Sequence, residues 1–377
     1  MRNHFSHHIE RRDHLVYSPF LKIINLFKSG KDDHISPLLD LKTITQLYDL
    51  MKRESVPDIY FPEDLALYTE ILGKVQRGNV NNLTRTSSYL NLFSKHPELH
   101  WSFLAHMVSR NAGYHMTDIR SNLLSHVLDD SEQRTLFSFL ERCNAAIFED
   151  AYPQLLLYEE WKLRGRSPFH LLKKFNVSTF MRIMWEDYLK TFDRRVLTLA
   201  LIMNEQHMIQ KRILSDPDLN IGIEKWKFFL QDRLEFTSIL FPYGKHSPFS
   251  LAGQFVSHFE KVNRRILLGK KLYSVLFHPT VFPTALSFSA HHPHTGSRED
   301  YWPHLYSKEE KKNRLFSPSL GSVWENMPPD NHSTADWFRN QRVEVMEPLL
   351  TTTVPNRFSM TRRWKARTSI LIHLKRD

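Results

Sequence analysis

Cysteine is almost absent from this sequence of 377 residues, which contains Cys143 and no other. One cysteine cannot form an intrachain disulfide, and it excludes the structural zinc sites that need two, three or four cysteine ligands. Because an unpaired thiol is typical of a reducing compartment, we expect a cytoplasmic protein. Cys143 lies in the apolar stretch LERCNAAIF, where the role of a small buried hydrophobic residue is expected rather than that of a nucleophile.

Long apolar runs and the common catalytic motifs are absent as well. No stretch approaches the ~18 uninterrupted apolar residues of a membrane-spanning helix, and the N-terminus lacks the apolar region of a signal peptide. The glycine-rich nucleotide-binding motifs, His-Glu-x-x-His and Gly-x-Ser-x-Gly are all missing. These absences argue against P-loop, Rossmann, metalloprotease and α/β-hydrolase proteins.

Glycine is scarce, with 11 residues in 377, or about 3% against a typical ~7%. Strand-rich folds need glycine in turns and bulges, so this scarcity favours helices joined by short loops. Apolar residues recur at spacings of three and four from Ser36 onward, which is the period of an amphipathic helix. We therefore predict a mainly α protein, with a multi-helix globular domain and a C-terminal loop-rich segment packed on it.

The helical period and the prolines divide the chain into four parts. We expect a polar basic arm over residues 1–35, a helical core over 36–277, a loop-rich His/Trp/Pro segment over 278–343, and a basic tail over 344–377 whose order is left open. Within the core, the pattern predicts helices over Pro97–Asn111 (ended by Gly113), Ser131–Phe148, Gln154–Arg164, Arg194–Leu214 and Ser250–Phe277.

Two of these helices, Pro97–Asn111 and Arg194–Leu214, carry polar residues that could belong to a functional site. His106 and Arg110 are four residues apart, so they can face one site and together hold an anion. In the second helix, a nearly all-apolar run ends at Asn204 and Glu205. These residues either form a polar cluster beside the core or mark the point at which the helix emerges into solvent.

The segment His291–His304 gathers histidines, hydroxyls and charged groups on an irregular backbone, as ligand sites often do. In a metal-binding interpretation, a divalent zinc, manganese or iron ion would take its ligands from His291, His292, His294, Asp300 and His304. In an anion-binding interpretation, Thr295-Gly296-Ser297-Arg298 cradles a phosphate with hydroxyls, amides and a guanidinium. In a third, purely structural interpretation, Tyr301 and Trp302 hold the loop against the rest of the protein, and the polar groups of the loop form hydrogen bonds with the backbone.

Positive charge is concentrated at the C-terminus. The formal net charge is +10, and the stretch from Arg357 to Asp377 contributes +6 of it. This stretch also contains the apolar run Ile370–Ile372. It could contact nucleic acid or lie on an anionic membrane surface, although a solvated basic tail is the commoner case.

Three segments carry a resemblance to a known family: Leu83–Ile119, Leu201–Leu214 and Pro293–Tyr306. Together they are similar to the YppC-like family of uncharacterised proteins from Bacillus-type bacteria, a domain of unknown function. The resemblance covers most of residues 36–340. It implies a cytoplasmic, bacterial, helical protein and supplies no catalytic residues.

These observations lead to one main hypothesis and one alternative. The main hypothesis is a pocket that binds a phosphate-bearing or metal-bound small molecule, whether or not it is enzymatic. It would be formed by His106, Arg110, Asn204, Glu205, His294, Ser297, Arg298 and Asp300. It requires Arg298 to lie within ~10 Å of His106 or Glu205, because side-chain hydrogen bonds span only ~3 Å. The alternative is a non-enzymatic scaffold that uses the basic tail.

Overall fold

Helices dominate the computed structural model, which describes residues 33–54, 60–121, 128–214, 238–244, 249–256, 261–327 and 336–365. The helices of four or more residues include α2 (Leu41–Arg53), α3 (Pro62–Gly78), α4 (Asn82–Lys95), α5 (His100–Asp118), α6 (Asp130–Arg164), α7 (Thr179–Thr191), α8 (Arg194–Ile209), α10 (Val262–Leu276), α11 (Phe282–His291) and α12 (Leu320–Val323). The predicted mainly α class is confirmed.

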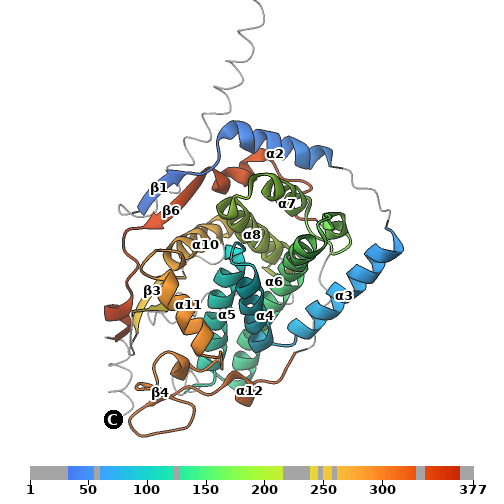
Figure 1. The fold of residues 1–377 in the computed structure, drawn as a ribbon. Helices are drawn as coiled ribbons and strands as arrows, with labels where there is room; N and C mark the ends of the chain where they lie inside the picture. The colour runs from blue at the N-terminus through green and yellow to red at the C-terminus, as the bar shows by residue number, and fades with distance from the viewer. Residues whose placement is uncertain are drawn as a thin grey trace, which may run out of the picture.

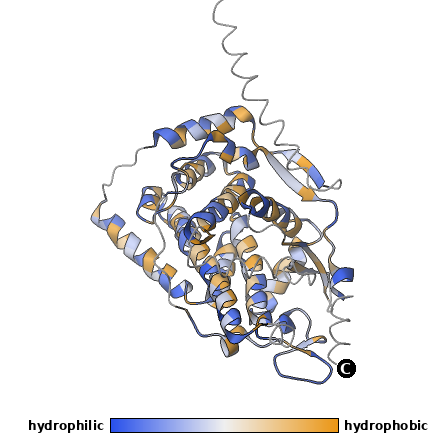
Figure 2. Cartoon of the chain, turned by 180° about the vertical axis from the view of Figure 1, so that it is seen from behind, coloured by the Kyte–Doolittle hydropathy of each residue, from blue (hydrophilic) through white to orange (hydrophobic). Residues whose placement is uncertain are grey.

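Helix α5 lies at the centre of the molecule, where it contacts α4, α6, α8 and α10 (Figure 1). Outer helices such as α2 and α3 alternate hydrophobic and hydrophilic residues (Figure 2), as one-sided packing requires. By contrast, α5 is surrounded, so its polar residues His106, Arg110 and Asn111 are buried with its apolar ones. Buried polar groups need internal partners, and those partners define the polar sites of this protein.

Helix α6 is one continuous element of 35 residues, although the sequence predicts two helices separated before Gln154. Pro153 lies inside it and removes one backbone hydrogen bond, a change that costs about 3 kcal/mol or more. Continuous burial on either side of the proline, including Ala151, Leu155 and Leu156, offsets this cost. The prediction of two helices was wrong because tertiary packing outweighs local propensity here.

A hairpin replaces the start of the predicted helix Ser250–Phe277. Strand β2 (Ser238–Tyr243) pairs antiparallel with β3 (Ser250–Phe255), and the helix begins only at Val262. Gly253 faces Ile239 O so closely that a Cβ atom would not fit. A short apolar run is ambiguous between helix and strand, and this close backbone approach favours the strand.

The two ends of the described chain are joined to each other. Strand β1 (Asp33–Pro37) pairs antiparallel with β6 (Thr351–Pro355), which follows the 3-10 helix η5 (Val343–Leu350). The predicted tail is therefore integrated as far as Lys365, because its apolar residues Met346, Met360 and Trp364 are buried. Most of the predicted N-terminal arm, and the tail beyond Lys365, lie outside the described residues.

Two short helical elements lie in the helical body: η1 (Phe169–Lys173), which contacts α6 and α7, and η2 (Gln210–Leu214), which follows α8. The loop-rich segment contains η4 (Arg298–Asp300) and the parallel pair β4 (Tyr306–Ser307) and β5 (Leu315–Phe316). Buried Tyr301, Trp302 and Tyr306 anchor this segment to β2 and β3 through a hydrophobic cluster that also contains Leu240 and Leu251.

Candidate functional site

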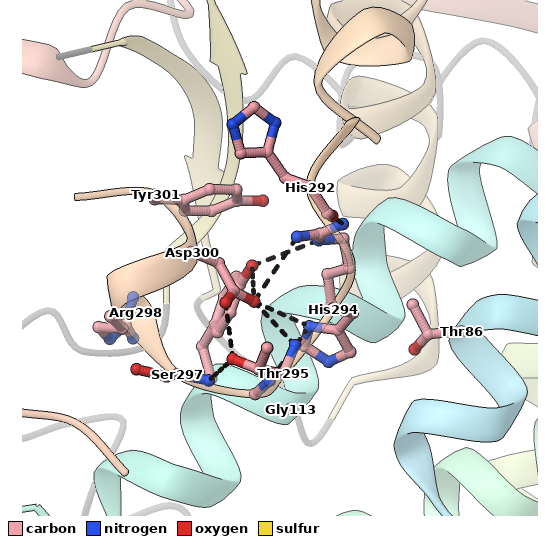
Figure 3. A network of polar contacts seen from close by, with 12 residues as sticks. Thr86, Gly113, His292, His294, Thr295, Ser297, Arg298, Asp300 and Tyr301 are labelled. Atoms are coloured by element: carbon pink, nitrogen blue, oxygen red, sulfur yellow. Dashed lines mark hydrogen bonds and ion pairs between the residues drawn. The ribbon is translucent and has the colours of Figure 1, made fainter. Parts of the chain in front are cut away.

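The loop after α11 is docked on α5 by the carboxylate of Asp300. This carboxylate accepts hydrogen bonds from Thr295 N at 2.9 Å, Thr295 Oγ1 at 2.6 Å and the Tyr114 hydroxyl at 3.3 Å. Arg110 Nη2 lies 3.6 Å from it and His294 Nδ1 lies 3.5 Å from it. Figure 3 shows these groups converging on Asp300 from the loop and from α5.

Protonation in this network follows from burial and from its hydrogen bonds. Burial, with the charge of Arg110 added, lowers the pKa of His294 to about 4, so its ring is neutral at pH 7. The side chain of Asn82 donates to Ser109 O, which turns Oδ1 toward His294 Nε2 at 2.9 Å. Since Oδ1 can only accept, the proton of His294 lies on Nε2. Burial opposes ionisation of Asp300. In the acidic range where Asp300 titrates, the protonated ring of His294, the charge of Arg110 and the hydrogen bond from Thr295 hold the pKa of Asp300 below its usual value.

Gly113 makes this docking possible. A Cβ atom at Gly113 would fall well inside van der Waals contact with Asn82 Oδ1 and His294 Nε2. The sequence predicts that the helix stops at this glycine, yet α5 continues through it to Asp118. The absence of a side chain at Gly113 allows the loop to approach α5 closely. The prediction that the helix ends at this glycine was wrong.

Arg298 belongs to a second buried group and faces away from the first (Figure 3). Its guanidinium binds the carboxylate of Asp118 with distances of 2.8 Å from Nε and 2.5 Å from Nη2. Ser297 Oγ donates to Ser317 O, and Arg298 N donates to Ser317 Oγ. The amides of the predicted phosphate cradle are therefore hydrogen-bonded within the protein. At Thr295 N, the carboxylate of Asp300 occupies the position that an external anion would take.

Asn204 forms a third group inside the helical core. Its Nδ2 donates to Asp150 Oδ2 at 2.5 Å, and its Oδ1 accepts from Ser178 Oγ and Trp337 Nε1. Burial raises the pKa of Asp150 to about 6. Asn204 is thus part of a polar cluster inside the core, and every polar atom of its side chain has a partner.

The predicted site residues do not converge on one pocket. Arg298 is bound to Asp118, which lies 12 residues beyond His106 on the same helix, or about 18 Å along its axis. Glu205 contacts Trp101 near the opposite end of α5. Trp101 and Asp118 are about 25 Å apart along the helix axis. His106 is bonded to Thr86 O and stacks on Phe103. Arg110, His294 and Asp300 come together, whereas Arg298, Asn204 and Glu205 lie apart.

The predicted metal ligands do not form a metal site. His292 stacks on Phe288 with ring centroids 4.3 Å apart, while His304 is exposed. His294 and Asp300 are neighbours, but they lack a third ligand. Within the ranges that the structure describes, no three His, Cys, Asp or Glu side chains are placed to hold a metal ion.

A cavity of about 190 Å³ lies beside Glu205, between α5, α6, α8 and α10. Most of its wall is apolar and includes Tyr89, Trp101, Ala105, Phe139, Ile209 and Leu268. Its polar wall contains Arg85, Glu205, Gln206 and Arg265. Sequence reasoning found Glu205 and missed the apolar wall, because cavity-lining and core residues are of the same types.

Glu205 is the carboxylate of this cavity. Its Oε2 accepts from Trp101 Nε1 at 3.2 Å, and its Oε1 accepts from Gln206 Nε2 at 2.9 Å. Burial raises the pKa of Glu205 to about 7, against the opposing effect of these two hydrogen bonds. Both donors are neutral, and in the described part of the chain no lysine, arginine or histidine forms an ion pair with it.

The fold and these sites define a helical protein that has an internal cavity and a docked polar loop. The chain belongs to a protein family of unknown function, DUF2515, whose model matches residues 77–364. It is 39% identical over 278 residues to the "Uncharacterized protein YppC" of Bacillus subtilis (strain 168), covering 72% of this chain and 84% of that protein. The family predicted from the sequence is confirmed. No solved structure matches the chain.

Among the described residues, no helix combines the length and the apolar character that a membrane span needs.

Proposed function

We propose that this protein binds a small, largely apolar molecule in the cavity beside Glu205. The cavity measures about 190 Å³, and an engineered cavity of about 150 Å³ is known to bind benzene. The expected ligand is therefore one ring with a short substituent. The observation that carries this proposal is a largely apolar cavity of ligand size with the Glu205 carboxylate in its wall.

The apolar wall supports binding of such a molecule. Apolar side chains that line a cavity lack neighbouring atoms on one side and therefore lose dispersion contacts. A ligand that fills the space restores these contacts and removes its own apolar surface from water.

The cavity fits this role better than the His291–His304 loop does. The loop's amides, its arginine Arg298 and the neighbouring Arg110 of α5 already bind groups of the protein. A phosphate there would have to displace Asp300 or Asp118, each of which is buried against an arginine. We place the protein in the cytoplasm, which the single buried thiol of Cys143 supports.

The test is binding of toluene to the full chain, measured by calorimetry and by thermal shift. The wild-type protein should bind toluene, and Ala105→Leu should abolish binding because the larger side chain enters the cavity. The matched control is Ala66→Leu, the same substitution on the exposed face of α3, which should bind toluene as the wild type does. Equal toluene binding by the wild type and Ala105→Leu, or none by either, would overturn the proposal.

A further inference from the structure

We infer that the ligand of this cavity carries a protonated amine that binds the carboxylate of Glu205. This inference rests on the proposed function and names the class of ligand. Its basis is the mismatch between Glu205 and its surroundings: the carboxylate faces a cavity, and its hydrogen-bond donors among the described residues are the neutral side chains of Trp101 and Gln206. Two carboxylate oxygens have about four acceptor sites, so room remains for an ammonium group.

Four other carboxylates in this protein have partners within the protein itself. Glu141 is paired with Arg85, Asp118 with Arg298, and Asp300 with Arg110. Asp150 lacks such an ion pair within the described residues, but it binds the amides of Asn204 and Gln154 and borders a space of only about 10 Å³. Glu205 differs because the space beside it can hold a molecule.

The two arginines of the cavity wall do not remove the preference of Glu205 for a cationic ligand. The charge of Arg85 is balanced by Glu141. Arg265 donates from Nε to Gln206 Oε1 at 2.9 Å and from Nη2 to Gln210 Oε1 at 3.0 Å. Gln206 thus accepts from Arg265 and donates to Glu205, which keeps the guanidinium one side chain away from the carboxylate.

Aromatic rings complete the recognition of a cationic amine. Tyr89 and Trp101 both line the cavity and meet edge to face, with centroids 5.6 Å apart. Such ring faces attract ammonium groups and also pack against an aromatic ligand body. Benzylamine joins one ring to one ammonium group, so it is the simplest probe of this combination.

The experiment compares benzylamine, benzyl alcohol, benzoate and toluene by calorimetry on the full chain at pH 8. Benzylamine should bind at least tenfold more tightly than benzyl alcohol, as a charge-assisted hydrogen bond predicts. Glu205→Gln should remove this preference, so that benzylamine and benzyl alcohol bind with similar affinity. Glu186→Gln, which changes an exposed glutamate of α7, is the matched control and should keep the preference.

Each other outcome overturns the inference in a distinguishable way. If toluene and benzyl alcohol bind and benzylamine gains nothing, the cavity binds ligands but not amines, and the proposed function stands. Tightest binding of benzoate would assign the ligand's polar group to Arg265. If none of the four probes binds, the proposed function fails together with the inference.

Discussion

Asp300 and Glu205 are two carboxylates that contact α5 and whose surroundings are opposite: Asp300 is enclosed by protein groups, and Glu205 faces a cavity. Asp300 receives hydrogen bonds from Thr295 and Tyr114 and lies against the guanidinium of Arg110. Glu205 receives two neutral donors and faces a cavity. The pKa of Asp300 is lowered, whereas burial raises the pKa of Glu205 to about 7. A carboxylate with a full set of partners holds a loop in place; one with few partners can bind something else.

The two sites also differ in how many of their polar side chains remain available to bind a ligand. The His291–His304 loop has the denser set of polar side chains, yet the protein itself saturates most of them. The cavity wall is mainly apolar, and Glu205 is the acid that it offers among the described residues.

Asp300→Ala should destabilise the protein by about 3 to 5 kcal/mol, because it leaves Arg110 buried without its carboxylate. Urea unfolding measures the change. Glu299→Ala, at the partly exposed neighbour, should change stability by less than about 0.5 kcal/mol. A loss below about 1 kcal/mol for Asp300→Ala would mean that Asp300 does not hold the loop.

Glu205→Gln should stabilise the ligand-free protein by up to about 3 kcal/mol at pH 8 and by little at pH 5. The folded-state pKa of Glu205 is about 7, above its ordinary value of 4.5. Between these values the folded state holds a proton that the unfolded chain has lost, so wild-type stability falls as pH rises. Urea unfolding at both pH values checks this, and an effect independent of pH would contradict a buried titrating carboxylate.

Gly113→Ala should cost about 1 to 3 kcal/mol, since the new methyl group meets Asn82 and His294. Gly321→Ala in α12 is the matched control, because no atom lies within 4 Å of the added carbon. Thermal unfolding of both variants decides the matter. Equal stability of the two would show that the loop does not pack closely against α5.

Thr295→Val should cost about 1 kcal/mol, because it removes one of the donors to Asp300 and leaves the shape of the side chain nearly unchanged. Thr295→Ser retains the hydroxyl and should be closer to the wild type in urea unfolding. If valine and serine were equivalent, the hydroxyl would contribute nothing to the docking of the loop.

The sequence allowed the helical class to be predicted, because amphipathic periodicity reflects one-sided burial. It also pointed to Arg110, His294 and Asp300, which do meet, and to Glu205. It could not show that Arg298 pairs with Asp118, since that contact joins positions 180 residues apart. The single helix across Pro153 and the strand at Gly253 depend on tertiary packing, which no local pattern contains.

The most direct test of the account is a crystal structure of the protein soaked with benzylamine at pH 8. The account predicts density for one ring in the cavity, with the amine nitrogen at hydrogen-bond distance of about 3 Å from the Glu205 carboxylate, and an unchanged network around Asp300. An empty or collapsed cavity, or benzylamine bound instead at the His291–His304 loop, would contradict it.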